Sequence, residues 1–261
     1  MKRSKTAFMA AMVFCAMVSA AANNVFAGSP FVTEDSGTQG KGNVEAEFTF
    51  EHQRADGGVK TTSLGNSFTL GIAPKIDLAI GYGYNFVNMP SGDDTRSMGD
   101  VAAQLKAVFR EGTGWLPTLG VKGGVSLPVE TGGQTTVLLT GIAQWEFEPF
   151  SVFANIGADI GTRLAGNDER TDVIRASLAG SWELREALAF VSEVIWEKQT
   201  KPSGNAALEW MIGTKWALND TMTLSAGVRL GLTSDSPDYT ILAGFTWNFR
   251  GEKTNASASG N

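Results

Sequence analysis

The feature that most constrains this chain is a strict alternation of apolar and polar residues, which recurs along most of its length. The last such stretch, Tyr239–Phe249, carries Tyr, Ile, Ala, Phe, Trp and Phe at odd positions and Thr, Leu, Gly, Thr and Asn at even positions. A period of two places the apolar side chains on one face of a β-strand. Because a tilted strand of about 9–11 residues crosses a bilayer, the stretch predicts a membrane-spanning strand, although alone it is also compatible with a soluble β-sandwich.

Eleven earlier stretches repeat this pattern. The twelve predicted strands cover 44–51, 67–72, 77–86, 100–110, 118–127, 136–147, 152–161, 174–184, 188–197, 208–216, 222–230 and 239–249. The ninth is the least regular, since Val191 and Ile195 put apolar side chains on its polar face. An even number of strands is what bacterial single-chain barrels have when both termini lie on the periplasmic side.

The connections between these strands alternate in length. Those after even-numbered strands are tight: 73–75, 148–149, 185–186 and 218–220, with 111–116 slightly longer. Those after odd-numbered strands are longer and polar: 53–60, 88–97, 129–134, 164–171, 199–205 and 233–238. Outer-membrane barrels show this asymmetry, with short periplasmic turns and longer outer loops, whereas a soluble sandwich has no reason to show it.

An open sheet in lipid would leave the N–H and C=O groups of its two edges unpaired, at a cost of several kcal/mol each. Pairing the first strand with the twelfth removes both edges. The sequence therefore predicts an all-β fold, a transmembrane antiparallel up-and-down β-barrel of twelve strands with periplasmic termini.

Large aromatic residues gather near the C-terminal ends of the even-numbered strands, which all reach the same membrane level. We expect an aromatic girdle of Phe109, Trp145, Phe147, Trp182, Trp216, Trp247 and Phe249. Amphipathic rings favour the headgroup boundary of a bilayer. Each tryptophan singly could instead anchor a core, but the shared level of the set favours the girdle.

The N-terminus has the parts of a secretory signal peptide. A cationic region at 2–5 precedes an apolar region at 7–22 and a small-residue cleavage site at 25–27. We expect cleavage after Ala27 and delivery to the cell outer membrane. The only cysteine, Cys15, lies in the apolar region, and processing as a lipoprotein is disfavoured because the large Phe14 precedes it. The mature chain would then contain no disulfide.

Charge and hydropathy exclude several classes of protein. Removal of the three cations of the signal peptide, which has no anions, takes the net charge from −6 to −9. This leaves no basic footprint for nucleic acid. After the N-terminus no run of 18 apolar residues occurs, which argues against a helical membrane protein.

We divide the chain into a signal peptide (1–27), a periplasmic lead-in (28–42), the barrel (43–249) and a flexible periplasmic tail (250–261). The lead-in contains Gly, Ser and Thr without a clear period. The sequence leaves open whether it enters the lumen of the barrel.

The polar faces of the strands carry charges of both signs that would point into the barrel. The expected lumen-lining residues are Glu45, Glu47, Asp77, Asp100, Lys106, Arg110, Lys122, Glu146, Asp159, Arg163, Arg175, Glu183, Glu193, Glu197, Glu209, Lys215 and Arg229. Such rings of charge line water-filled pores and set their ionic selectivity. Opposite charges could instead pair across a filled lumen, because a barrel of about twelve strands lies between filled and open sizes. We favour a narrow channel with a mild acidic bias.

No residue pattern indicates a catalytic, cofactor or metal site. The sole histidine, His52, stands at a loop edge without an evident Ser partner, which disfavours a lipid-acting enzyme. No Cys or His cluster offers zinc ligands. Two groups of acids, Asp93 and Asp94 with Asp100 and Asp235 with Asp238, could bind calcium weakly, but solvated acids are the commoner case.

The stretch Pro30–Asn43, followed by Glu45 and Glu47, resembles the opening of a family of outer-membrane proteins named for the meta-pathway of phenol degradation. The stretches 74–78, 99–101 and 120–130 are similar to the family as well. The resemblance implies a barrel for uptake of small, hydrophobic or aromatic compounds. It supplies no site residues.

Two kinds of partner are expected besides a small-molecule solute. The apolar faces would contact outer-membrane lipid. The last strand, with Gly244, Trp247 and Phe249, looks like the terminal signal that barrels present to their assembly machinery. The leading functional hypothesis is a channel without cofactor; the alternatives are a plugged structural or interaction barrel and, third, a membrane enzyme.

Overall fold

The computed structural model describes residues 29–129, 134–161, 172–200 and 206–249. The expected signal peptide and C-terminal tail lie outside these residues. The strands are β1 Val44–Arg54, β2 Lys60–Ala73, β3 Ile76–Asn88, β4 Thr95–Met98, β5 Val101–Arg110, β6 Thr118–Leu127, β7 Thr136–Phe147, β8 Phe150–Gly161, β9 Asp172–Arg185, β10 Leu188–Gln199, β11 Ala206–Asn219, β12 Met222–Gly231 and β13 Tyr239–Phe249. A short 3-10 helix, Asp56–Gly58, lies between β1 and β2.

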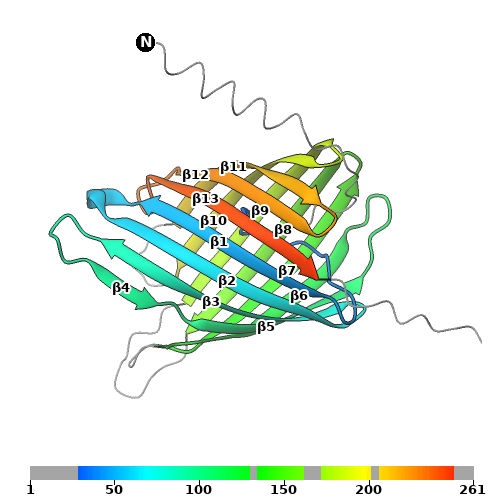
Figure 1. Ribbon diagram of the computed structural model, residues 1–261, viewed down its shortest axis with the longest axis horizontal. Helices are drawn as coiled ribbons and strands as arrows, with labels where there is room; N and C mark the ends of the chain where they lie inside the picture. Colours follow the sequence, from blue (N-terminus) through cyan, green and yellow to red (C-terminus); the bar gives the residue numbers. More distant parts are fainter. Residues whose placement is uncertain (1–28, 130–133, 162–171, 201–205, 250–261) are drawn as a thin grey trace, which may run out of the picture.

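The strands form one closed antiparallel barrel, which confirms the predicted fold (Figure 1). Each strand pairs with its neighbours along the chain, and β1 pairs with β13 from Val44↔Phe249 to Arg54↔Tyr239. Aromatic residues support this seam on its outer face, since the ring of Phe48 lies 6.3 Å from that of Phe245 and 6.5 Å from that of Phe68. Closure leaves no edge strand in the wall, as lipid requires.

One strand was not predicted. The loop expected at 88–97 contains β4, which pairs with β3 from Tyr84↔Met98 to Val87↔Thr95. The register of β4 on β3 is offset by one residue from that of β5 on β3, and the amide of Gly99 donates to the carbonyl of Gly83 at 2.8 Å. β4 is therefore the continuation of β5 beyond a bulge at Gly99-Asp100, and the wall keeps twelve strands.

The outer face of the wall is apolar. Large side chains such as Leu105, Ile156 and Leu178 are 49%, 68% and 57% exposed. Exposed, alternating apolar rows of this kind suit a lipid surface rather than water. None of the helices in the described part of the chain has the length and hydropathy needed to cross a bilayer.

The two ends of the barrel differ. The turns between β2 and β3, β7 and β8, β9 and β10, and β11 and β12 are two residues long. They gather at the right-hand end of Figure 1, where β1 begins and β13 ends. The connection between β5 and β6, which is seven residues long, lies at the same end. The connections from β1 to β2 and from β3 to β4 lie at the opposite end. We call these the turn end and the loop end.

Candidate functional site

A segment of the chain lies inside the barrel. Residues 29–43, here called the lumen segment, hydrogen-bond or pack against every strand of the wall. The contacting wall residues, one for each strand, are Glu47 (β1), Gly71 (β2), Asp77 (β3), Lys106 (β5), Lys122 (β6), Gln144 (β7), Asn155 (β8), Ser177 (β9), Glu193 (β10), Lys215 (β11), Ser225 (β12) and Leu242 (β13). Followed from 43 back to 29, the segment makes one lap of the inner wall.

Phe31 is the apolar anchor of this segment. Its ring packs against a buried cluster of Val191, Met211 and Leu242 and lies 5.9 Å from the ring of Phe153. Val191 and Met211 have no solvent exposure. This contact explains why Val191, an apolar residue, lies on the polar face of β10. The wall needs an apolar patch where Phe31 docks. The ammonium of Lys215 lies 4.9 Å from the centre of the same ring, within the range of a cation–π contact.

Glu193 holds the adjacent backbone. Its carboxylate, which is 1% exposed, accepts hydrogen bonds from the amides of Val32 at 3.1 Å and Thr33 at 2.6 Å. The hydroxyl of Thr33 donates to Ser177 at 2.8 Å. A buried carboxylate is costly unless it is hydrogen-bonded, so these donors fix the position of the lumen segment on β10.

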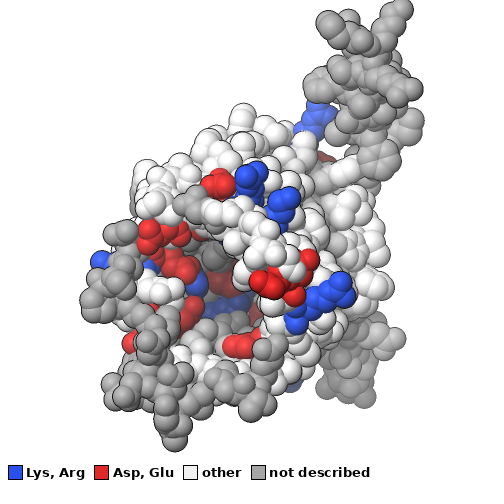
Figure 2. Space-filling view, turned by 90° about the vertical axis from the view of Figure 1, so that its left-hand side faces the viewer, with Lys and Arg blue, Asp and Glu red and all other residues white. Residues whose placement is uncertain are grey.

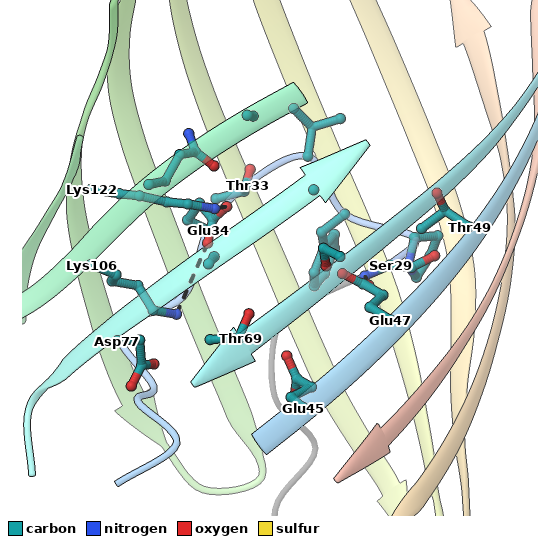
Figure 3. A pocket seen from close by; sticks show the side chains of 18 of the residues that line it. Ser29, Thr33, Glu34, Glu45, Glu47, Thr49, Thr69, Asp77, Lys106 and Lys122 are labelled. Carbon is teal, nitrogen blue, oxygen red and sulfur yellow. Dashed lines mark hydrogen bonds and ion pairs between the residues drawn. The ribbon is translucent and has the colours of Figure 1, made fainter. Parts of the chain in front are cut away.

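Four charged groups meet beside this point, three of which, Glu34, Lys106 and Lys122, are labelled in Figure 3. Lys122 pairs with Glu34, and the Lys106 ammonium lies 3.2 Å from an Asp35 oxygen and 4.0 Å from a Glu34 oxygen. Burial raises the pKa of the Glu34 carboxyl, but the ammonium groups of Lys122 and Lys106 outweigh it, so that the pKa lies below its ordinary value. We call Glu34, Asp35, Lys106 and Lys122 the charge quartet.

Two glycines allow the lumen segment to approach the wall. A Cβ atom on Gly71 would lie 1.8 Å from the carbonyl oxygen of Gly40, and one on Gly244 would lie 2.1 Å from the hydroxyl oxygen of Ser29. Both positions therefore require glycine for close contact. The alternation of the strands gave no sign that a second chain segment lies against these glycines.

The lumen segment leaves two cavities beside it. The first holds about 200 Å³ and runs along the wall of β1, β2, β3 and β5. It reaches from Glu45 and Asp77, each the second residue of its strand at the turn end, to Glu51, which is about 20 Å further along β1 at about 3.3 Å per residue. Its lining contains five acids and two bases: Glu34, Glu45, Glu47, Glu51 and Asp77, with Lys106 and Lys122.

The second cavity holds about 160 Å³ and extends toward the loop end. It is lined by Asp159 and Arg175, which lie close to the loop ends of β8 and β9. Arg175 bridges Asp159 at 3.3 Å and Glu197 at 2.9 Å. Figure 2 looks onto this end of the molecule, where acidic and basic side chains surround a hollow.

The remaining expected lumen residues occupy different levels. Arg229 lies 3.6 Å from Glu209 and 4.0 Å from Glu51, and Asp100 accepts from Ser126 at 3.3 Å. Toward the turn end, Glu146 accepts from Gln144 at 2.9 Å, whereas Arg110 and Glu183 are exposed at the ends of their strands. Arg163 lies outside the described residues.

Four of the seven aromatic residues expected to form a girdle, Phe147, Trp182, Trp247 and Phe249, make ring contacts near the turn end. Trp182 stacks on Phe150 at 5.8 Å, and Trp247 lies 4.1 Å from Phe249. The sequence reasoning missed Trp115, which is 84% exposed and lies 5.2 Å from Phe147. Trp115 stands in the connection between β5 and β6, so strand alternation gave no signal for it.

The other residues considered for chemistry have ordinary partners. The Nδ1 atom of His52 lies 2.9 Å from the hydroxyl of Thr62, and Asp94 accepts from Asn88 at 2.9 Å and from the amide of Met89 at 3.2 Å. Among the described residues, no three His, Cys, Asp or Glu side chains are grouped so that they could hold a metal ion.

Comparison with solved structures shows the fold at low sequence identity. An outer membrane channel from Pseudomonas putida F1 is 14% identical, with a TM-score of 0.64 over 87% of this chain and 100% of that chain. The NanC porin is 10% identical, with a TM-score of 0.56 over 78% and 98%. The β domain of the Bordetella autotransporter BrkA is 14% identical, with a TM-score of 0.53 over 78% and 98%.

No curated protein sequence matches the chain. A family of sequences does match it, over residues 22–249, which include the lumen segment and the whole barrel. The expected resemblance is confirmed, and the chain belongs to the family described as "Putative MetA-pathway of phenol degradation".

Proposed function

We propose that the protein is a channel of the outer membrane through which small solutes diffuse, without covalent chemistry. The observation that carries the proposal is the pair of adjoining cavities, which together extend from the turn end to the loop end past the lumen segment. The barrel fold shared with a channel and a porin supports the same function.

The lining of the cavities supports a preference for cations. None of the ion pairs within 4.0 Å in the described part of the chain involves Glu45, Glu47 or Asp77, whereas both lysines of the first cavity face carboxylates of the lumen segment. Carboxylates that line a lumen and have no cationic partner within 4.0 Å attract cations and repel anions.

The family name supports a narrower proposal about the solute. Small aromatic compounds such as phenols have a size compatible with cavities of about 200 Å³ and 160 Å³. We also propose that the signal peptide is cleaved after Ala27, that the last strand engages the assembly machinery, and that the apolar outer face contacts outer-membrane lipid.

A second candidate is a plugged structural or interaction barrel. It is favoured by the lumen segment itself, which contacts every strand of the wall and buries an apolar anchor. In this case the cavities would hold water without connecting the two sides.

Single-channel recording separates the two candidates. The mature chain is refolded, inserted into a planar lipid bilayer and recorded across a KCl gradient. Stepwise current with a reversal potential on the cation-selective side supports the channel. A folded, heat-resistant barrel that carries no current would support the plugged barrel instead.

A further inference from the structure

The two cavities of the lumen meet at a small set of residues. Val32, Glu34, Gln104 and Lys122 line both of them. Every other lining residue belongs to one cavity only, and Thr33 of the first cavity is hydrogen-bonded to Ser177 of the second. We call the four shared residues the neck, because any passage between the cavities goes by them.

An ion pair crosses this neck. Glu34 comes from the lumen segment and Lys122 from β6, and Figure 3 shows their side chains directed toward each other. The backbone of Glu34 is fixed on the far side, since its amide donates to Asn155 at 2.6 Å and its carbonyl accepts from the same side chain at 3.0 Å. The carboxylate therefore has little freedom to move away from Lys122.

The local charges balance. Glu34 and Asp35 carry two negative charges, and Lys106 and Lys122 carry two positive charges within 4.0 Å of them. The neck is thus neutral overall, while the first cavity beside it has an excess of carboxylates. Because the dielectric of a narrow lumen is lower than that of bulk water, removal of one charge here acts strongly on a passing ion.

We propose that the Glu34–Lys122 ion pair is the barrier that limits the conductance of the channel and keeps the neck electrically neutral. The inference rests on the proposed channel function. Glu34→Gln leaves the Lys122 charge uncompensated and opposes cations at the neck. Lys122→Gln leaves a carboxylate excess and favours cations. The double substitution removes the pair without changing the net charge.

The test is a double-mutant cycle measured in planar bilayers. Glu34→Gln should lower the K⁺/Cl⁻ permeability ratio and Lys122→Gln should raise it. Each change should be at least about five-fold, the factor that one unit charge at about 4 Å exerts in water. The double variant should return to the wild-type ratio but conduct more, because no ion pair closes the neck. Lys122→Arg should behave as wild type.

A matched control is Lys75→Gln. Lys75 pairs with Glu111 at 2.8 Å in the turns outside the lumen, so its loss should change neither the ratio nor the conductance. Heat-modifiable mobility on gels verifies that each variant is folded.

The outcomes separate the two claims. If the wild type conducts and all neck variants keep its permeability ratio and conductance, the inference is overturned and the proposed channel function is not. Single variants that shift the ratio in the same direction also overturn it. A silent wild type overturns the proposed open channel, and a double variant that is equally silent overturns the barrier as well.

Discussion

At the scale of single residues, the lumen is organised by contacts between the wall and a segment that has no regular structure. Phe31 supplies burial, Glu193 binds two backbone amides, and the charge quartet joins the segment to β5 and β6. Burial of a phenylalanine side chain is worth about 1.5–3 kcal/mol, so the anchor and the hydrogen bonds are comparable contributions. Each can be tested by one substitution.

Phe31→Ala should release the lumen segment without unfolding the barrel. Phe31 is partly buried, so its loss should cost at most about 1.5–3 kcal/mol, which shifts the docking equilibrium by a factor of up to about 100. The strand ladders do not involve Phe31. Residue 33 is 2% exposed when the lumen segment is docked, so a cysteine introduced there by Thr33→Cys reports release of the segment. Adding Phe31→Ala to this reporter should speed the labelling of the cysteine by maleimide. The outward-facing Phe50→Ala is the control, and equal labelling rates in both variants would contradict the role of the anchor.

Gly71→Ala should disturb the packing of the lumen segment from the side of the barrel wall. The new Cβ would lie 1.8 Å from the Gly40 carbonyl oxygen, so backbone must move, at about 1–3 kcal/mol for overpacking. The control is Gly141→Ala, whose Cβ would meet Ile156 at an ordinary 3.6 Å. The midpoint of thermal unfolding should fall for Gly71→Ala and not for Gly141→Ala. Equal midpoints for the two variants would show that the backbone at Gly40 moves away from the new Cβ without cost.

Arg175→Ala tests whether the second cavity conducts. The substitution leaves Asp159 and Glu197 without the guanidinium that bridges them at 3.3 Å and 2.9 Å. An ion path there should become more cation-selective, by up to about five-fold in permeability ratio. A variant that loses thermal stability but keeps the wild-type reversal potential would indicate a structural network instead.

At the scale of elements, the sequence was informative wherever a strand has one apolar face. Alternation located all twelve strands of the wall, because lipid requires every outward residue to be apolar. It failed at β4, whose residues Thr95–Met98 are mostly polar and continue β5 beyond a bulge that interrupts the period. Strand starts and ends also shifted by a few residues, since the polar ends of strands near the loops carry no alternation.

The lumen segment could not be predicted as part of the site. It has no period, so its partners cannot be inferred from spacing, and its anchor Phe31 looks like any isolated aromatic residue. Val191 was the available signal, because an apolar residue on a polar face needs a partner inside the barrel. Alternation identified Lys106, Lys122 and Glu193 on the inner face, but not Glu34, Asp35 or Thr33, which complete their interactions.

At the scale of the whole molecule, a barrel closed by β1 and β13 encloses a lumen that one chain segment narrows but does not fill. The wall satisfies the requirements of lipid, and the lumen segment determines how much of the interior remains for solute. Conduction should therefore depend on this segment more than on the number of strands.

The most direct measurement compares the single-channel conductance of the mature chain with that of a variant lacking residues 29–42. The β1–β13 and β1–β2 ladders begin at Val44, so the variant should still fold and show heat-modifiable mobility. A small, cation-selective conductance in the full mature chain and a several-fold larger one in the deletion variant are the expected results. Equal conductance in the two folded proteins would contradict the account, because the lumen segment would then not restrict the passage.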